Sequence, residues 1–266
     1  MRLMFKDKRV LVTASTSGIG YTIAKRFFEE GAKIVISSRN PDHISKAIQR
    51  LTKGKISSNV YGIPCDLTVY DDVKRLVTQT IEFLGGIDIF VYNSGNPDNE
   101  PATFFETSPS DWEYAVKLYT LSPVWLTLEI APYMIKQGYG RIIFLGSVSI
   151  KEPMSILALA DVTRISILPL TKLLAKELGT KGILVNAVLP GSFMTEGAKR
   201  LIERLAQREK KSKKSIKKEI ASLASLNRFG SPRELANVVL FLASDAASFI
   251  NGSVITVDGG MSHSIF

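Results

Sequence analysis

The sequence predicts one α/β domain, a doubly wound parallel sheet of seven strands that is covered by helices on both faces. Short apolar segments alternate along the chain with segments whose apolar residues recur at helical spacing, which is typical of buried parallel strands joined by helices. A chain of 266 residues that is 45% hydrophobic can bury one large core. No linker, composition shift or internal repeat divides the sequence, so residues 1–266 are expected to form a single domain.

The predicted elements follow one another in a regular order. Strands are expected at residues 10–12, 33–38, 60–65, 87–92, 141–145, 183–188 and 253–257. The first helix carries apolar residues at helical spacing from Ile23 to Phe28, and later helices are expected at residues 41–51, 71–83, 112–136, 157–178 and 232–243. Because proline disrupts the interior of a helix, Pro123 and Pro132 are expected to kink or divide the segment 112–136.

The first strand ends in a turn, Thr13–Gly20, that is suited to a phosphate. A strand that breaks at glycines into a helix directs free backbone N–H groups and the positive end of a helix at one point. The spacing is not Gly-x-Gly-x-x-Gly, because Ala14 stands at the first glycine position, so a plain surface turn remains the alternative. The candidate phosphate-binding residues are Ser15, Ser17, Gly18, Ile19 and Gly20.

Ligands of such a sheet bind at the carboxyl ends of the strands, near the point where the strand order reverses. After the second strand, Arg39 can clamp a 2′-phosphate, whereas an acidic side chain would hold a ribose hydroxyl. NADP(H) is therefore favoured over NAD(H), with a merely solvated Arg39 as the alternative. Asp66 could accept from an adenine amino group, and Gly95 permits close approach of the backbone to a cofactor. Further candidates are Ser38, Leu67, Asn93, Ser94, Pro190, Gly191 and Thr195.

The net charge of +9 is concentrated in residues 199–218, which contain ten basic and two acidic residues. A solvated helix face is the plain interpretation of this basic segment, and an anionic substrate or contact with nucleic acid are the alternatives. No aromatic residue interleaves with these lysines, which argues against a stacking surface for single-stranded nucleic acid. Nucleic acid is therefore not expected to be a partner.

Other residue counts exclude several classes of protein. Cys65 is the only cysteine, which excludes an internal disulfide framework and fits a reducing compartment. With His43 and His263 as the only histidines, neither a histidine-based triad nor a metal site is expected. The best candidate for a membrane span, 156–170, is broken by charges, and no signal peptide is expected. We therefore expect a cytoplasmic protein without a membrane segment.

The chain resembles the short-chain dehydrogenase/reductase family over about residues 6–260. The motifs that carry this resemblance lie at residues 13–20, 65–66, 93–95, 140–142, 146–147, 185–191 and 257–260. The resemblance implies a Rossmann-type domain, a nicotinamide cofactor, a homo-oligomer (a tetramer or a dimer) and the interconversion of alcohols and carbonyl groups. The chain is most similar in character to 3-oxoacyl-carrier-protein reductases and to sugar dehydrogenases.

The catalytic pattern of this family is altered here. The resemblance places a serine that holds the substrate oxygen at Ser147, but Ala160 stands where the family has its proton-transferring tyrosine. Arg164 stands at the position of the lysine that lowers the pKa of that tyrosine, and Tyr119 at that of a supporting asparagine. Two other Tyr-x-x-x-Lys pairs begin at residues 21 and 70, but neither follows a serine at a strand end.

Three functions are compatible with these residues. In an NADP(H)-dependent oxidoreductase with a rearranged site, Ser147 polarises a carbonyl group and Arg164 holds the ribose or stabilises an oxyanion. Tyr119, or else Tyr92, would then supply the proton. The second function is a catalytically silent dinucleotide-binding or scaffold protein. The third is an enzyme of another class, such as a dehydratase or epimerase, or a protein that binds anions through the basic segment.

Two segments are expected to lie beside the substrate or a neighbouring subunit. The basic segment occupies the place of the family's substrate lid, about residues 192–228, and the substrate is expected to be a small molecule, with an anion as one option. The apolar residues of this segment predict two helices whose leucines and isoleucines face the site while the lysines face water. The tail, Met261–Phe266, is expected to reach a neighbouring subunit, and a frayed terminus is the alternative.

Overall fold

A parallel sheet forms the centre of the computed structural model, which describes residues 5–97 and 100–265. The strand order is β3-β2-β1-β4-β5-β6-β7, and every pair of neighbouring strands is parallel. The predicted fold class is therefore confirmed, and each predicted strand lies in the sheet. The strands are β1 (Arg9–Val12), β2 (Lys33–Ser38), β3 (Val60–Pro64), β4 (Ile89–Tyr92), β5 (Gly140–Leu145), β6 (Ile183–Pro190) and β7 (Val254–Val257).

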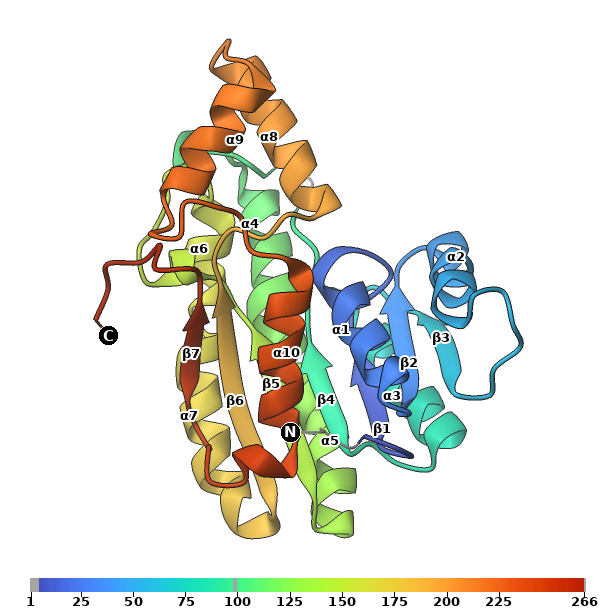
Figure 1. The fold of residues 1–266 in the computed structure, drawn as a ribbon. Coiled ribbons are helices and arrows are strands. Elements are labelled where there is room, and N and C mark those ends of the chain that lie inside the picture. The colour runs from blue at the N-terminus through green and yellow to red at the C-terminus, as the bar shows by residue number, and fades with distance from the viewer. Residues whose placement is uncertain (1–4, 98–99, 266) are drawn as a thin grey trace.

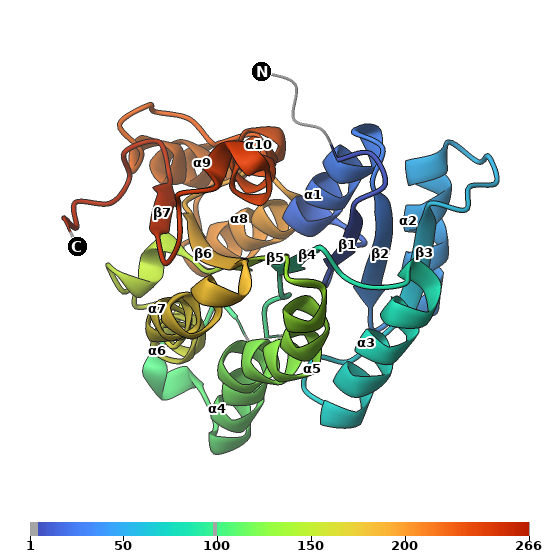
Figure 2. The ribbon, with the colours of Figure 1, turned by 90° about the horizontal axis from the view of Figure 1, so that it is seen from below.

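Helices cover both faces of the sheet (Figure 2). One face is covered by α1 (Gly18–Glu29), α2 (Pro41–Thr52) and α10 (Pro232–Ala243), and the other by α3 (Tyr70–Leu84), α5 (Ser122–Gln137) and α7 (Ile167–Leu178). Successive strand residues point to opposite faces, so Leu11 belongs to one core while Val10 and Val12 belong to the other. Among the described residues, no helix has the length and apolarity needed to cross a membrane.

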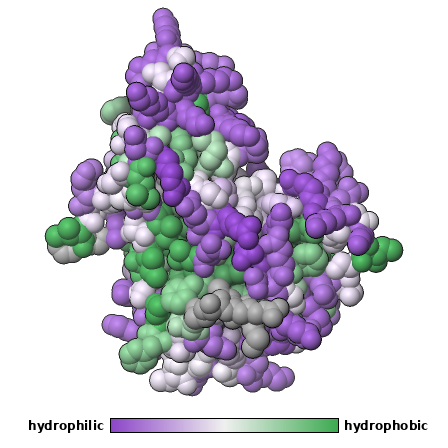
Figure 3. Space-filling model, viewed as in Figure 1, coloured by the Kyte–Doolittle hydropathy of each residue, from purple (hydrophilic) through white to green (hydrophobic). Residues whose placement is uncertain are grey.

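The strand order reverses at β1, which pairs with β2 on one side and β4 on the other. Ligand sites of doubly wound sheets lie at the carboxyl ends of the strands beside such a reversal. Two further helices, α8 (Glu196–Arg208) and α9 (Lys213–Ser222), stand above this end of the sheet (Figure 1). Hydrophilic side chains cover much of their outer surface (Figure 3). The two helices expected in the basic segment are thus present.

Two helical segments differ from their predictions. The segment 112–136 begins as α4 (Pro109–Val116), passes through a π-helical turn at Lys117–Leu121 and continues as α5. The irregularity therefore precedes Pro123, while Pro132 lies within α5 without ending it.

The prediction of one helix over 157–178 is wrong, because α6 (Ala158–Arg164) ends before α7 begins. The carbonyl oxygen of Thr163 accepts hydrogen bonds from the hydroxyls of Thr120, at 2.8 Å, and Ser166, at 3.0 Å. These side chains satisfy a carbonyl that a continuous helix would pair with a backbone N–H. The break therefore depends partly on contacts made by another helix, which the local sequence does not reveal.

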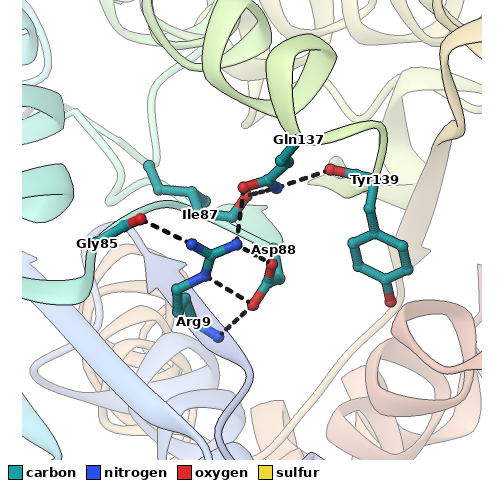
Figure 4. A network of polar contacts seen from close by, with 6 residues as sticks. All are labelled: Arg9, Gly85, Ile87, Asp88, Gln137 and Tyr139. Atoms are coloured by element: carbon teal, nitrogen blue, oxygen red, sulfur yellow. Dashed lines mark hydrogen bonds and ion pairs between the residues drawn. The ribbon is translucent and has the colours of Figure 1, made fainter.

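An ion pair ties the amino ends of the central strands together (Figure 4). The backbone N–H and the guanidinium of Arg9 donate to Asp88, and the guanidinium also donates to the carbonyl of Gly85 at 2.7 Å. Gln137 accepts from Arg9 at 2.7 Å and donates to the carbonyls of Ile87 and Tyr139. Burial alone would raise the pKa of Asp88, but the hydrogen bonds and charge of Arg9 outweigh it and lower this pKa.

Replacing Asp88 by asparagine is expected to lower the free energy of unfolding at pH 7 by about 2 kcal/mol, because charged hydrogen bonds to Arg9 are lost. The pKa of Asp88 is lower in the folded state, so its contribution is present above the unfolded pKa of about 3.9 and is lost as the pH falls through the folded pKa. Urea unfolding at pH 7 and at a series of acidic pH values measures both effects. Asp245→Asn, at a largely exposed partner of Arg141, is the control and should change stability little.

Candidate active site

The turn between β1 and α1 is shaped to receive a phosphate. Gly18, at the start of α1, has a φ of +58°, and the first N–H groups of a helix have no intrahelical partner. A Cβ atom at Gly20 would lie 2.6 Å from Nδ2 of Asn93 and 2.7 Å from the carbonyl oxygen of Ala14, so only glycine fits. This close packing leaves the helix N-terminus open to the cavity, and a dinucleotide pyrophosphate fits such a cradle.

Two predicted cofactor residues, Asn93 and Ser15, stabilise this turn through hydrogen bonds. Nδ2 of Asn93 donates to the carbonyls of Ala14, at 2.9 Å, and Thr13, at 3.3 Å. The hydroxyl of Ser15 is buried and donates to the carbonyl of Val12 at 2.6 Å. The Ser15 side chain therefore stabilises the turn from inside instead of facing a ligand.

A cavity of about 470 Å³ lies at the carboxyl ends of the strands. It brings together most of the predicted site residues, and residues after five different strands contribute to its wall. The predicted residues that line it are Ser17, Gly18, Ile19, Gly20, Asn93, Ser94, Gly95, Ser147, Arg164, Pro190, Gly191 and Thr195.

Besides Ser15, four predicted cofactor residues do not line this cavity, and they lie at the end of β2 and after β3. Arg39 is exposed and its guanidinium donates to the hydroxyl of Tyr114 at 3.2 Å. Oδ1 of Asp66 accepts from the N–H and the hydroxyl of Thr68, at 2.9 and 2.8 Å. Ser38 and Leu67 adjoin these two residues in the sequence. In the sheet, β2 and β3 lie on one side of β1, and β4, β5 and β6 lie on the other. The four residues are therefore on the side where an extended dinucleotide would place its adenosine.

Ser147 follows β5 and lines the cavity. Its Oγ lies 2.7 Å from Oγ of Ser149, and the hydroxyl of Ser149 donates to the carboxyl of Asp161. Burial raises the pKa of Asp161, against hydrogen bonds from Ser149 and the N–H of Met154 and the charge of Arg164. The sequence reveals Asp161 only as a charge within an apolar segment, so its connection to Ser147 emerges from the fold.

Ala160, where the sequence resemblance predicts a tyrosine, has no titratable group, and a second carboxyl group lies beside it. Oε1 of Glu100 accepts from the N–H of Ala160 at 2.8 Å, while Oε2 is buried without a hydrogen-bond partner among the described residues. Burial raises the pKa of Glu100, although the Ala160 N–H and the charge of Arg164 act against it. Glu100 lies in the loop after β4, where no local pattern indicated a role, so sequence reasoning missed it.

The geometry does not support Tyr119 or Tyr92 as the proton source. Both are fully buried, and neither is among the described residues that line the cavity. The hydroxyl of Tyr119 donates to the carbonyl of Gly95 at 3.1 Å, and that of Tyr92 to the carbonyl of Leu118 at 2.5 Å. Burial raises the pKa of both phenols.

Tyr119 instead supports neighbouring groups. The guanidinium of Arg164 lies 4.0 Å from the centre of the Tyr119 ring, a distance at which a cation is attracted to an aromatic face. Tyr21 and Tyr70, which begin the two other Tyr-x-x-x-Lys pairs, contact Arg50 and Glu129 respectively. These contacts agree with the prediction that neither pair supplies the catalytic tyrosine and lysine.

The two helices of the basic segment have distinct sides. Leu201, Leu205, Ile220 and Leu223 line the cavity, together with Arg200 and Arg204. Ile202 and Ile216 pack with Leu205 in a small core between the helices.

Two of the lysines, Lys211 and Lys213, form ion pairs with acidic side chains of α8, α9 and the turn between them. Lys211 lies 2.8 Å from Glu209 and 3.0 Å from Glu219, and Lys213 lies 2.5 Å from Glu203. The charge that these lysines present to a ligand is therefore smaller than the residue count suggests.

The comparisons with known proteins agree with this arrangement. A family model described as enoyl-(acyl carrier protein) reductase matches residues 13–262. The chain belongs to the short-chain dehydrogenase/reductase family. The resemblance in sequence and the predicted Rossmann-type architecture are thereby confirmed.

Relatives of this short-chain dehydrogenase/reductase cover nearly its whole length. Dehydrogenase/reductase SDR family member 4 of Homo sapiens is 32% identical over 255 residues, which are 96% of this chain and 87% of that protein. The 3-oxoacyl-[acyl-carrier-protein] reductase FabG of Aquifex aeolicus is 33% identical over 261 residues, 98% of this chain and 100% of the relative. The structure of L-sorbose reductase from Gluconobacter frateurii, complexed with NADPH and L-sorbose, has a TM-score of 0.92 and 31% identity, with both chains fully covered.

Ala14 has a φ of +46°, a left-handed conformation that costs a residue with a Cβ about 1–2 kcal/mol. Ala14→Gly is therefore expected to raise the free energy of unfolding by about 1 kcal/mol, after allowance for the entropy of the more flexible unfolded chain. Urea unfolding measures the change. Ala24→Gly, in the middle of α1, is the matched control and should lower stability by about 1 kcal/mol. Equal signs for the two substitutions would contradict the strain at Ala14.

Proposed function

We propose that this short-chain dehydrogenase/reductase is an NADP(H)-dependent oxidoreductase that acts on a carbonyl or hydroxyl group. The observation that carries the proposal is that the phosphate cradle at Gly18–Gly20, Ser147 and Arg164 line one cavity. The solved relative with NADPH supports the choice of cofactor. Arg39 supports it too, because an exposed guanidinium at the end of β2 can bind a 2′-phosphate.

The side chains around the cavity have different roles in the proposed reaction. When bound, the nicotinamide supplies or accepts the hydride. Ser147 holds the substrate oxygen by a hydrogen bond, and Arg164 contributes a fixed positive charge that holds the ribose or stabilises negative charge on that oxygen. Arginine does not release its proton in proteins, so Arg164 cannot replace the missing phenol as an acid. The apolar residues of α8 and α9 exclude water when they cover a substrate.

Binding and turnover test this function separately. Calorimetry with NADPH and NADH measures cofactor affinity, and oxidation of NADPH is then followed with L-sorbose, an acetoacetyl thioester and a panel of aldehydes and ketones. Turnover is expected with at least one of them, and Ser147→Ala is expected to reduce kcat by about 100-fold, the scale of losing one donor to a developing oxyanion. Absence of binding to both cofactors would overturn the proposal.

A catalytically silent dinucleotide-binding protein is the second candidate, favoured by one observation. Ala160 has no group that transfers a proton, and the hydroxyls of Tyr119 and Tyr92 are bonded to backbone carbonyls. Tight binding of NADPH without turnover of any compound in the panel would support this candidate. Gain of activity in the double variant Ala160→Tyr, Arg164→Lys would then indicate that only the proton donor was missing.

The oligomer remains a prediction. Exposed apolar side chains on α6, on α7 and between them, among them Val162, Ile165 and Leu173, are candidates for a contact between copies. In the tail, Ile265 is largely exposed, while Phe266 lies outside the described residues. Sedimentation equilibrium is expected to give a dimer or tetramer, and a monomer at micromolar concentration would contradict this part of the proposal.

Replacing Arg39 by aspartate is expected to reduce the affinity for NADPH relative to NADH by at least about tenfold, because a carboxylate repels the 2′-phosphate and can hold a ribose hydroxyl. Titration of each cofactor by calorimetry gives the ratio. Lys46→Asp introduces the same charge change at another exposed position, on α2, and should leave the ratio near its original value. An unchanged ratio in Arg39→Asp would place the phosphate elsewhere.

A further inference from the structure

A buried carboxyl group is connected to the cavity by two serine hydroxyls. Ser147 and Ser149 line the cavity, with their Oγ atoms 2.7 Å apart, and the Ser149 hydroxyl bonds to Oδ1 of Asp161. Oδ2 of Asp161 accepts from the N–H of Met154 at 2.7 Å. Ser149 is 2% exposed and Asp161 is 4% exposed, so the pair is shielded from bulk solvent. These three side chains form a continuous hydrogen-bonded chain from a titratable group to the wall of the site.

The direction of this chain depends on the proton at Asp161, because each serine hydroxyl has one hydrogen to donate. When Asp161 is ionised, Ser149 donates to it and Ser147 donates to Ser149. The oxygen of Ser147 can then only accept, which suits a substrate hydroxyl. When Asp161 is protonated, it donates to Ser149, Ser149 donates to Ser147, and Ser147 is free to donate to a carbonyl oxygen in the cavity.

The geometry points to a proton relay in which Asp161, through Ser149 and Ser147, replaces the phenol that Ala160 lacks. In reduction, hydride addition forms a C–H bond at the carbonyl carbon, and the electron pair of the broken C–O π bond moves to oxygen. That oxygen takes the proton of Ser147, Ser147 takes that of Ser149, and Ser149 takes that of Asp161, which is left as a carboxylate. A hydronium ion that enters the cavity then gives a proton to Ser147 and becomes water, the two serines pass a proton back to Asp161, and oxidation runs each step backwards.

This inference rests on the proposed oxidoreductase function and makes Asp161 a positioning and proton-storing residue that acts through Ser147. Among the described residues, the charged groups that act on Asp161 are Arg164, on the same helix, and Glu100, from the loop after β4. Burial raises the pKa of Asp161, so the protonated form persists to a higher pH than in an exposed aspartate. Glu100 is the weaker candidate, because its carboxyl bonds to the N–H of Ala160 and no described side chain links it to Ser147.

Asp161→Asn keeps the size of the side chain and can still accept from Met154 but cannot supply a proton. It is expected to reduce kcat for NADPH-dependent reduction by at least about 100-fold with KM little changed, the scale of losing a positioned acid. Ser149→Ala interrupts the chain and should cause a similar loss, which Ser149→Thr should largely restore. Ser166→Ala, which removes a serine hydroxyl that bonds to the carbonyl of Thr163 outside the chain, is the matched control.

The pH profile distinguishes proton supply from a merely structural role. Because the protonated form of Asp161 loads the chain, the rate of reduction in the unmodified protein should be full below the pKa of Asp161 and fall as the pH rises through it. Asp161→Asn should lack this limb, and its rate should be low at every pH. A profile in Asp161→Asn that matches the unmodified protein would overturn the relay.

Infrared spectroscopy supplies a readout that needs neither substrate nor turnover. A pH titration of the resting protein should reveal the carbonyl stretch of a buried protonated carboxyl that persists in Glu100→Gln and disappears in Asp161→Asn. Absence of this band overturns the inference. If the band is present but no compound in the panel is reduced, the proposed function has failed while the protonated Asp161 stands, so the two failures are distinguishable.

Discussion

The close contact between the β1–α1 turn and Asn93 is the constraint on which the site depends. Asn93 stands at the end of β4, and its amide holds two carbonyls of the turn while Gly20 packs against it without room for a Cβ. This contact joins the carboxyl ends of β1 and β4, the two strands between which the strand order reverses. The turn and the loop after β4, which both line the cavity, are thereby fixed relative to each other, and such preorganisation lowers the cost of binding a ligand.

Beside Ser147, two buried carboxyl groups lie next to Ala160, the residue at which the sequence resemblance predicts a tyrosine. The N–H of Ala160 donates to Glu100, and Asp161 is the next residue in the sequence. Burial raises the pKa of both carboxyl groups. Buried carboxyl groups with raised pKa values occur often at functional sites, because a raised pKa extends the pH range over which the acid can donate a proton. Arg164, held on the ring of Tyr119, supplies positive charge without a mobile proton.

The sequence predicts the sheet well because its strands are continuous apolar segments, and it predicts the cradle because Gly18 and Gly20 interrupt such a segment. The family resemblance predicts Ser147, which lies directly after β5 in the wall of the cavity. The sequence does not reveal the orientation of Tyr119, which depends on a π-helical turn and on contacts with Gly95. It also misses Glu100 and Asp161 as a group, because they come from a loop and a helix 61 positions apart and meet only through tertiary packing.

The Arg9–Asp88 network lies at the amino ends of the strands, whereas the cavity lies at their carboxyl ends. Energetic effects of changes at sites so far apart, without shared partners, are usually additive. The fold therefore places this stabilising ion-pair network at the opposite end of the sheet from the cavity. A residue of the cavity wall can therefore be exchanged without disturbing the ion pair at the opposite end of the sheet.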